Sequence, residues 1–144
     1  MTRLVLASAS PRRSELLKTW GYAFEVAEPG VPEDQVTASS PTHLVELLAR
    51  RKAQAVRMRS RVGILLAADT VVALKEKVFG KPRDAKDAAR ILKALSGKRH
   101  AVITGVCVME GSSGRSRTAH AVSQLRMKKL SDREIERYVA SGEP

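Results

Sequence analysis

The chain has 144 residues, which is room for one domain with a proper core and hardly for two, so we expect a single domain over residues 1–144. Its 26 Lys and Arg residues against 15 Asp and Glu residues give a net charge of +11, which favours polyanionic partners such as nucleic acid, an anionic membrane surface or phosphorylated small molecules. The single cysteine excludes a disulfide framework, and no apolar run approaches the roughly 20 residues that span a bilayer. We therefore expect a cytoplasmic protein without membrane contact.

Hydrophobic periodicity and capping residues predict an alternation of strands and helices, with Ser40, Asp84 and Ser131 as the N-caps of the three later helices. In chain order we predict strand 2–7, helix 11–20, strand 22–26, loop 27–40, a helix from residue 41, strand 64–74, strand 78–79, helix 84–95, strand 101–109, strand 118–125 and a helix from residue 131. The turn-forming segment 111–114 joins the last two strands and predicts an antiparallel hairpin.

Two arginines open the first predicted helix. Ser10 is a good N-cap and Pro11 suits the first helical position, so Arg12 and Arg13 fall in the first turn. Because the unpaired N–H groups and the helix dipole already make that end positive, two cations there call for an anion. We predict a phosphate held by backbone N–H groups, both guanidinium groups and the Ser8 and Ser10 hydroxyls. A solvated arginine pair beside an ordinary cap is the alternative.

Three further charged residues stand in apolar segments or between turn-forming residues. Lys52 falls on the apolar stripe of the second helix, so its side chain is predicted to point towards the body of the protein. Asp69 follows the apolar run 64–68, at the carboxyl end of a central strand, where open α/β sheets place their ligand crevice. Lys81 stands between a glycine and a proline. A snorkelling lysine stem, a loop-capping aspartate and a surface lysine are the alternative readings.

This order of elements predicts an α/β fold with a mixed twisted sheet, helices flanking it and a substrate cleft at the carboxyl ends of the strands. The cleft would gather Ser8, Arg12, Arg13, Lys52, Asp69 and Lys81. Four cations and one carboxylate in a single groove favour a phosphate-binding site over a solvated surface.

With these residues assembled, the sequence resembles the Maf family of nucleoside triphosphate pyrophosphatases, whose fold is similar to that of inosine triphosphatases. The matching motifs are Leu-Ala-Ser-Ala-Ser-Pro-Arg-Arg at 6–13, Ala-Ala-Asp-Thr-Val-Val at 67–72, Gly-Lys-Pro-Arg-Asp-Ala at 80–85, Leu-Ser-Gly-Lys-Arg-His-Ala-Val-Ile-Thr-Gly at 95–105 and Tyr-Val-Ala-Ser-Gly-Glu-Pro at 138–144. They span nearly the whole chain in the family's order.

The resemblance implies hydrolysis of dTTP and UTP, or of modified pyrimidine nucleotides, to the monophosphate and pyrophosphate. It implies Asp69 as the proton acceptor, and Glu33 with Asp69 as ligands of a divalent cation, Mg²⁺ or Mn²⁺. Arg12 and Thr70 are implied in the choice of base. The implied phosphate-site residues are Ser8, Arg12, Arg13, Lys52 and Lys81.

The resemblance also implies a homodimer. Family members continue past Ser-Gly-Glu-Pro with further segments, so we expect this chain, which ends at Pro144, to lack the family's C-terminal segment.

Two alternative functions remain from the sequence. A nucleic-acid-binding protein would use the positive charge without catalysis, but the aromatic content of 3% offers few stacking platforms, so no stable nucleic acid is expected as a partner. An inactive descendant that binds nucleotides without turnover is the second alternative.

Overall fold

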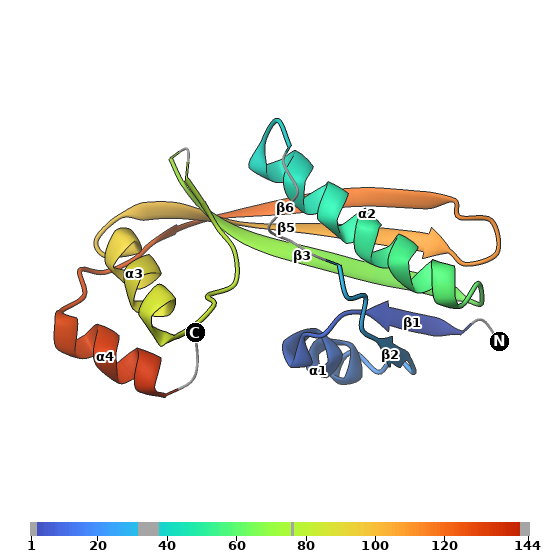
Figure 1. The fold of residues 1–144 in the computed structure, drawn as a ribbon, viewed down its shortest axis with the longest axis horizontal. Helices are drawn as coiled ribbons and strands as arrows, with labels where there is room; N and C mark the ends of the chain where they lie inside the picture. The colour runs from blue at the N-terminus through green and yellow to red at the C-terminus, as the bar shows by residue number, and fades with distance from the viewer. Residues whose placement is uncertain (1–2, 32–37, 76, 142–144) are drawn as a thin grey trace. The chain divides into compact units, whose positions relative to one another are not determined.

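The protein is described by a computed structural model that covers residues 3–31, 38–75 and 77–141. The strands form one mixed sheet in the order β2-β1-β3-β5-β6, with β4 paired to β3 (Figure 1). The strands are β1 (Leu4–Ala7), β2 (Glu25–Ala27), β3 (Ile64–Leu74), β4 (Lys77–Phe79), β5 (Arg99–Glu110) and β6 (Ser116–Arg126). The helices are α1 (Pro11–Thr19), α2 (Pro41–Arg59), α3 (Ala85–Leu95) and α4 (Asp132–Ala140).

Strand pairing confirms the predicted mixed sheet. β1 pairs in parallel with both β2 and β3, whereas β4 pairs antiparallel with β3. β5 and β6 form the predicted hairpin, because Glu110 N donates to Arg115 O near the turn and Met127 N donates to Lys98 O at the far end. Helices flank this sheet, so the α/β class expected from the order of elements is confirmed.

The chain divides into two compact units, each with its own core. The first comprises residues 1–69 and 104–121, and the second comprises residues 70–103 and 122–144. The single domain expected over residues 1–144 stays a prediction.

In the first unit, α2 covers one face of the sheet. Alternate residues of β1, β3 and β5 meet the apolar stripe of α2, since successive strand residues point to opposite faces. The resulting buried cluster contains Val5, Ala7, Ala49, Ala53, Val56, Leu65, Ala67, Cys107 and Met109. α2 approaches β5 closely: a Cβ placed on Gly105 would lie 2.4 Å from the backbone C and O of Val45. Only glycine leaves room for this approach.

α1 lies on the opposite face of the first unit and buries Leu17. Beside it an apolar cavity of about 280 Å³ is lined by Leu4, Leu17, Trp20, Tyr22, Ile64, Leu66 and Val108. The strand residues in this lining have even numbers, whereas those packed against α2 have odd numbers, so the two helices occupy opposite faces of β1 and β3.

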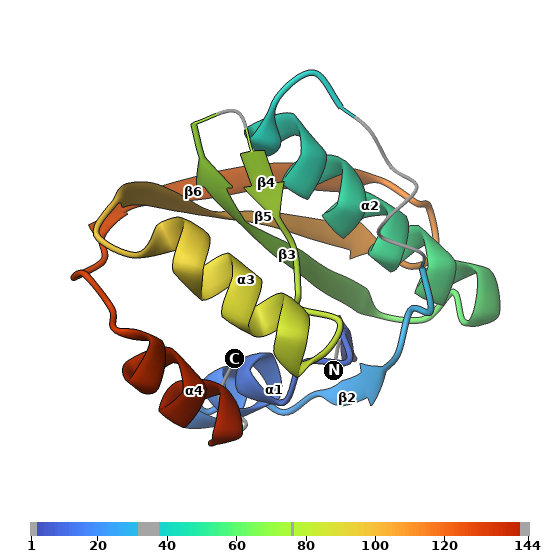
Figure 2. The same cartoon turned by 60° about the vertical axis from the view of Figure 1, so that its left-hand side comes forward.

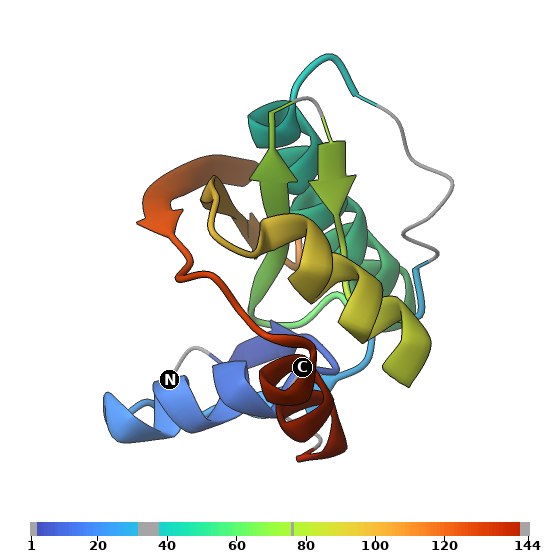
Figure 3. The same cartoon turned by 90° about the vertical axis from the view of Figure 1, so that its left-hand side faces the viewer.

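In the second unit, α3 packs on the hairpin of β3 and β4, and α3 contacts α4 (Figures 2 and 3). Leu74, Phe79 and Leu95 form its buried cluster. Ser96 Oγ accepts from Leu130 N at 2.7 Å and Gly97 N donates to Lys128 O at 3.2 Å, which joins the end of α3 to the segment before α4.

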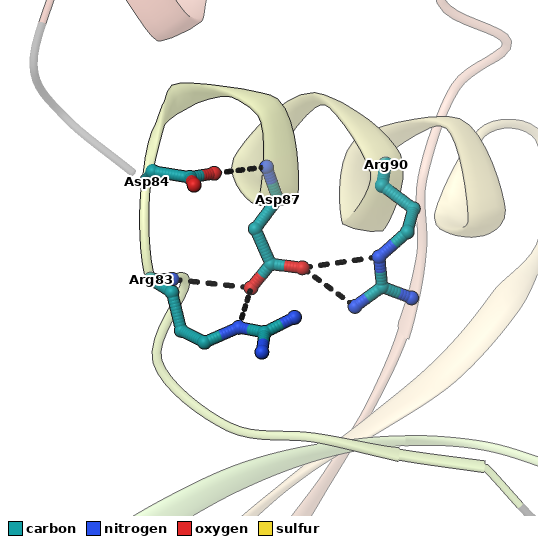
Figure 4. A network of polar contacts seen from close by, with 4 residues as sticks. All are labelled: Arg83, Asp84, Asp87 and Arg90. Atoms are coloured by element: carbon teal, nitrogen blue, oxygen red, sulfur yellow. Dashed lines mark hydrogen bonds and ion pairs between the residues drawn. The ribbon is translucent and has the colours of Figure 1, made fainter.

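A carboxylate network closes the N-terminus of α3 (Figure 4). Asp84 caps the helix by accepting from Asp87 N at 2.7 Å. Asp87 in turn accepts from the Arg90 guanidinium at 2.7 and 3.0 Å and from Arg83 N at 3.1 Å. The Arg90 hydrogen bonds, followed by the backbone N–H of Arg83, hold the pKa of Asp87 below its usual value.

The predicted caps Ser40, Asp84 and Ser131 are confirmed by hydrogen bonds from the first turns of their helices. Most predicted bounds agree with the structure to within about two residues, and the largest difference is in the second strand. The strand predicted at 22–26 is β2 at Glu25–Ala27, because Tyr22 N still donates to Leu17 O at the end of α1. The strand predicted over 64–74 is confirmed as β3, so Asp69 lies inside this strand and not at its carboxyl end, and the residues beyond Asp69 pair with β4.

Candidate functional site

The centre of the candidate site is a buried ion pair between α2 and β3. Lys52 Nζ lies 2.8 Å from Asp69 Oδ1. The helical spacing that aligns Lys52 with the apolar stripe carries it inwards, and β3 places Asp69 two residues after its last pairing with β1 at Ala67. The prediction that Lys52 points into the protein is confirmed, and its head group ends on a carboxylate instead of in water.

A second cation reaches the same place from α1. Arg13 Nη1 donates to the carbonyl oxygen of Ala68 at 3.1 Å, and Lys52 Nζ donates to that oxygen at 3.3 Å. The structure therefore brings Arg13, Lys52 and Asp69 together around one peptide unit of β3, within the first compact unit.

Ser8 lies at the end of β1, next to Ala7, which pairs with Ala67 of β3. Its side chain is buried, and its Oγ accepts from Ser10 N at 3.0 Å. Ser10 occupies the N-cap position with an extended backbone, but its hydroxyl makes no capping hydrogen bond. The prediction that Ser10 caps α1 is therefore correct in position, whereas the side-chain contact that shapes this turn comes from Ser8.

Of the other predicted site residues, the structure gives the position and exposure of three. Arg12, on α1, is exposed beside the half-buried Arg13. Thr70 follows Asp69 and is exposed, and Lys81 is exposed in the second unit. Glu33 lies outside the described residues. The roles that the resemblance gives to Arg12, Thr70, Lys81 and Glu33 stay predictions.

The described part of this centre offers one carboxylate, Asp69, to the divalent cation that the resemblance implies. Among the described residues, no group of three or more His, Cys, Asp or Glu side chains could hold a metal by itself. Mg²⁺ is usually held by one or two carboxylates together with substrate phosphates and water. A single carboxylate at Asp69 matches that donor set, and the predicted second ligand, Glu33, falls in the part of the chain that is not described.

The pairing of Lys52 with Asp69 is the feature that sequence reasoning missed. The sequence predicted both residues in the site. It assigned Lys52 to phosphate and did not predict which group Lys52 contacts in the absence of substrate. One signal was available, because each charge interrupts an apolar pattern and buried charges are normally paired.

The family model of the Maf-like proteins matches residues 3–144 of the chain. The dTTP/UTP pyrophosphatase of Pelotomaculum thermopropionicum is 44% identical over 144 residues, which cover 100% of this chain and 75% of the relative. The dTTP/UTP pyrophosphatase of Symbiobacterium thermophilum is 46% identical over 144 residues, which cover 100% of this chain and 73% of the relative.

Solved structures share the fold at low identity. The nucleoside-triphosphatase (dITP/XTP pyrophosphatase) of Mycobacterium abscessus superposes with a TM-score of 0.57 at 17% identity, covering 89% of this chain and 75% of that one. The Ham1 protein of Staphylococcus aureus gives a TM-score of 0.58 at 14% identity, with coverage of 90% and 72%. With a family model matched along almost its whole length and relatives above 40% identity, the chain belongs to the Maf family.

Proposed function

We propose that the protein hydrolyses the α–β phosphoanhydride bond of dTTP and UTP, releasing the nucleoside monophosphate and pyrophosphate. The observation that carries this proposal is the Lys52–Asp69 pair, a carboxylate and a cation held together in a buried position. Relatives named dTTP/UTP pyrophosphatase at 44 to 46% identity support the same reaction and the pyrimidine bases. Modified pyrimidine nucleotides are a further substrate class of this proposal.

In this reaction a water oxygen attacks the α-phosphorus, the bond from that phosphorus to the bridging oxygen breaks, and pyrophosphate leaves. Asp69 takes the proton from the attacking water. Lys52 pairs with the anionic form of Asp69, which is the form that can accept a proton. Arg12 and Lys52 supply positive charge for the phosphate oxygens, whose negative charge must be stabilised as the bond breaks. A divalent cation held by Asp69 and Glu33, Mg²⁺ or Mn²⁺, would add charge neutralisation.

The structure also bears on the alternative of a nucleic-acid-binding protein. Arg57, on α2, donates to the carbonyl oxygens of Gly111 and Ser112 at 2.9 and 3.3 Å, and Arg59 donates to that of Glu28. These hydrogen bonds direct the two guanidinium groups to backbone carbonyls of the same unit but leave their positive charge in place, so the salt dependence of DNA binding is the measurement that separates the two alternatives.

Pyrophosphate release from dTTP, UTP, ATP and GTP in the presence of Mg²⁺ or Mn²⁺ tests the proposal. We expect turnover of dTTP and UTP, and a loss of about 10²-fold or more in kcat for Asp69→Asn, because the amide cannot accept the proton. Asp132→Asn, at the exposed start of α4, is the matched control and should retain full activity. Tight nucleotide binding without turnover would favour an inactive nucleotide-binding protein, and strongly salt-dependent DNA binding without turnover would favour the nucleic-acid alternative.

The cytoplasm remains the expected compartment, and a homodimer the expected assembly. Of the helices in the described part of the chain, none combines the length and apolarity that a bilayer-spanning helix needs.

A further inference from the structure

The carbonyl oxygen of Ala68 is held by two side chains that carry positive charge. Arg13 Nη1 lies 3.1 Å from it and Lys52 Nζ lies 3.3 Å from it. The next residue in the chain is Asp69, whose Oδ1 is 2.8 Å from the same Lys52 Nζ. The peptide unit that carries Asp69 is therefore fixed from two directions, by α1 and by α2.

These contacts to Ala68 lie just beyond the last residue of β3 that pairs with β1. The parallel register between β1 and β3 ends with the pair Ala7 and Ala67, one residue before Ala68. β1 itself ends at Ala7, and the next residue, Ser8, donates its N–H to Ala27 O of β2. Arg13, on the helix that follows β1, supplies a side-chain donor to β3 just beyond the end of this pairing.

Arg12 and Arg13 are adjacent in the sequence but differ in environment. Arg12 is exposed, whereas Arg13 is half-buried with its guanidinium on the β3 carbonyl. A phosphate arriving from solvent can approach an exposed guanidinium directly. Arg13 is less exposed and its Nη1 already donates to a carbonyl oxygen of β3, so a phosphate could reach only the remaining N–H groups of this guanidinium.

We propose that Arg13 is a positioning residue and not a phosphate ligand: it fixes the Ala68–Asp69 peptide while Lys52 moves from the Ala68 carbonyl to a phosphate oxygen. The inference rests on the proposed function. A lysine is suited to move between the Ala68 carbonyl and a phosphate, because its ammonium group lies at the end of a flexible side chain and has three donors. An arginine is suited to hold the Ala68–Asp69 peptide in place, because its planar guanidinium group directs its N–H donors in fixed directions.

The test compares kcat, KM and direct binding for Arg13→Met, Arg13→Lys and Arg12→Met, with Lys18→Met on the exposed surface of α1 as the inert control. Binding is measured with a dUTP analogue that has a methylene group between the α- and β-phosphorus atoms. For Arg13→Met we expect kcat to fall about 10²-fold, since a carboxylate misplaced by about 1 Å costs that much. KM and the Kd of the analogue should stay within about twofold of wild type.

The two other variants should behave differently. Arg13→Lys keeps a donor and a charge and should recover about tenfold in kcat over Arg13→Met. Arg12→Met should raise KM and Kd with a smaller change in kcat, as expected for a phosphate ligand. If Arg13→Met does not fold, Arg13→Lys carries the test: a reduced kcat at unchanged KM supports positioning.

A rise in KM and Kd for Arg13→Met with kcat unchanged would overturn the proposal, and so would wild-type behaviour of that variant. The ¹³C′ chemical shift of Ala68 gives a readout that does not depend on activity. It should change in Arg13→Met and stay constant in Arg12→Met. If the wild-type protein hydrolyses no nucleotide, the proposed function fails, while an unchanged Ala68 shift in Arg13→Met would separately show that Arg13 does not hold this peptide.

Discussion

Lys52 Nζ lies 2.8 Å from Asp69 Oδ1, and the two side chains are only 9% and 5% exposed. Removing two charges from water costs several kcal/mol per ion, and their attraction repays this only partly. A buried pair is therefore a poor device for stability. Its position beside the end of β1 is better explained by chemistry that needs an anionic carboxylate and a mobile cation close together.

Removing one partner of this pair should lower the free energy of unfolding. Lys52→Met leaves the Asp69 carboxylate buried without that ammonium, and the free energy of unfolding should fall by about 3–5 kcal/mol. The double variant Lys52→Met/Asp69→Asn should be more stable than Lys52→Met alone, because no uncompensated charge remains. Urea denaturation measures all of these variants.

The exposed pair of Lys93 and Asp132, 3.8 Å apart, is the matched control, and Lys93→Met should cost less than about 1 kcal/mol. Strictly additive effects of Lys52→Met and Asp69→Asn would contradict a direct interaction between the two groups.

The contact between α2 and β5 should not tolerate a methyl group at Gly105. A Cβ there would lie 2.4 Å from the backbone of Val45, so Gly105→Ala should destabilise the protein by roughly 1–3 kcal/mol or more. Gly80→Ala is the control, since no atom lies within 4 Å of its built Cβ and its φ is not positive. Thermal unfolding of both variants checks the prediction, and equal midpoints would contradict the close approach.

Local signals in the sequence predicted the ends of helices well. Ser40, Asp84 and Ser131 cap their helices because each cap depends on residues three positions away. The inward direction of Lys52 was also predictable, since it follows from helical periodicity alone. These features need no knowledge of other elements.

Features that depend on two elements were not predictable in the same way. The Lys52–Asp69 contact requires the position of α2 along β3, which no local pattern encodes. Asp69 stands where the apolar run stops, but the sequence did not show that β3 pairs with β1 before this residue and with β4 after it. The contact of Arg13 with Ala68, 55 residues away, was not predicted because it is a tertiary contact.

The capping box of α4 should respond to acid. A hydrogen bond from Lys128 and then one from Ser131 N lower the pKa of Glu134 in the folded state. A carboxyl group with a lowered folded pKa contributes stability above its unfolded pKa of about 4.3, and this contribution is lost as the pH falls through the folded value.

Glu134→Gln tests this effect, because glutamine keeps an acceptor for the cap but does not titrate. Wild type should be more stable than the variant at about pH 7, and the gap should close at about pH 3. The free energy of unfolding in urea at both pH values gives the comparison. A gap that persists in acid would show that the charge of Glu134 does not matter.

The thiol of Cys107 should be unreactive in the folded protein. Burial raises the pKa of Cys107, an effect that Arg50 and a hydrogen bond with Ser116 offset in part. The side chain is fully buried, so the thiolate is both scarce and inaccessible. A disulfide reagent at about pH 8 should modify the protein rapidly only after denaturation in guanidinium chloride. Rapid labelling of native protein would contradict the packing of β5 under α2.

The central claim is that water, assisted by Asp69, attacks the α-phosphorus of a pyrimidine nucleoside triphosphate. Hydrolysis of dTTP in ¹⁸O-labelled water, followed by mass spectrometry of both products, tests it most directly. The account predicts one ¹⁸O atom in the dTMP and none in the pyrophosphate. Label in pyrophosphate, or release of labelled orthophosphate instead of pyrophosphate, would contradict it.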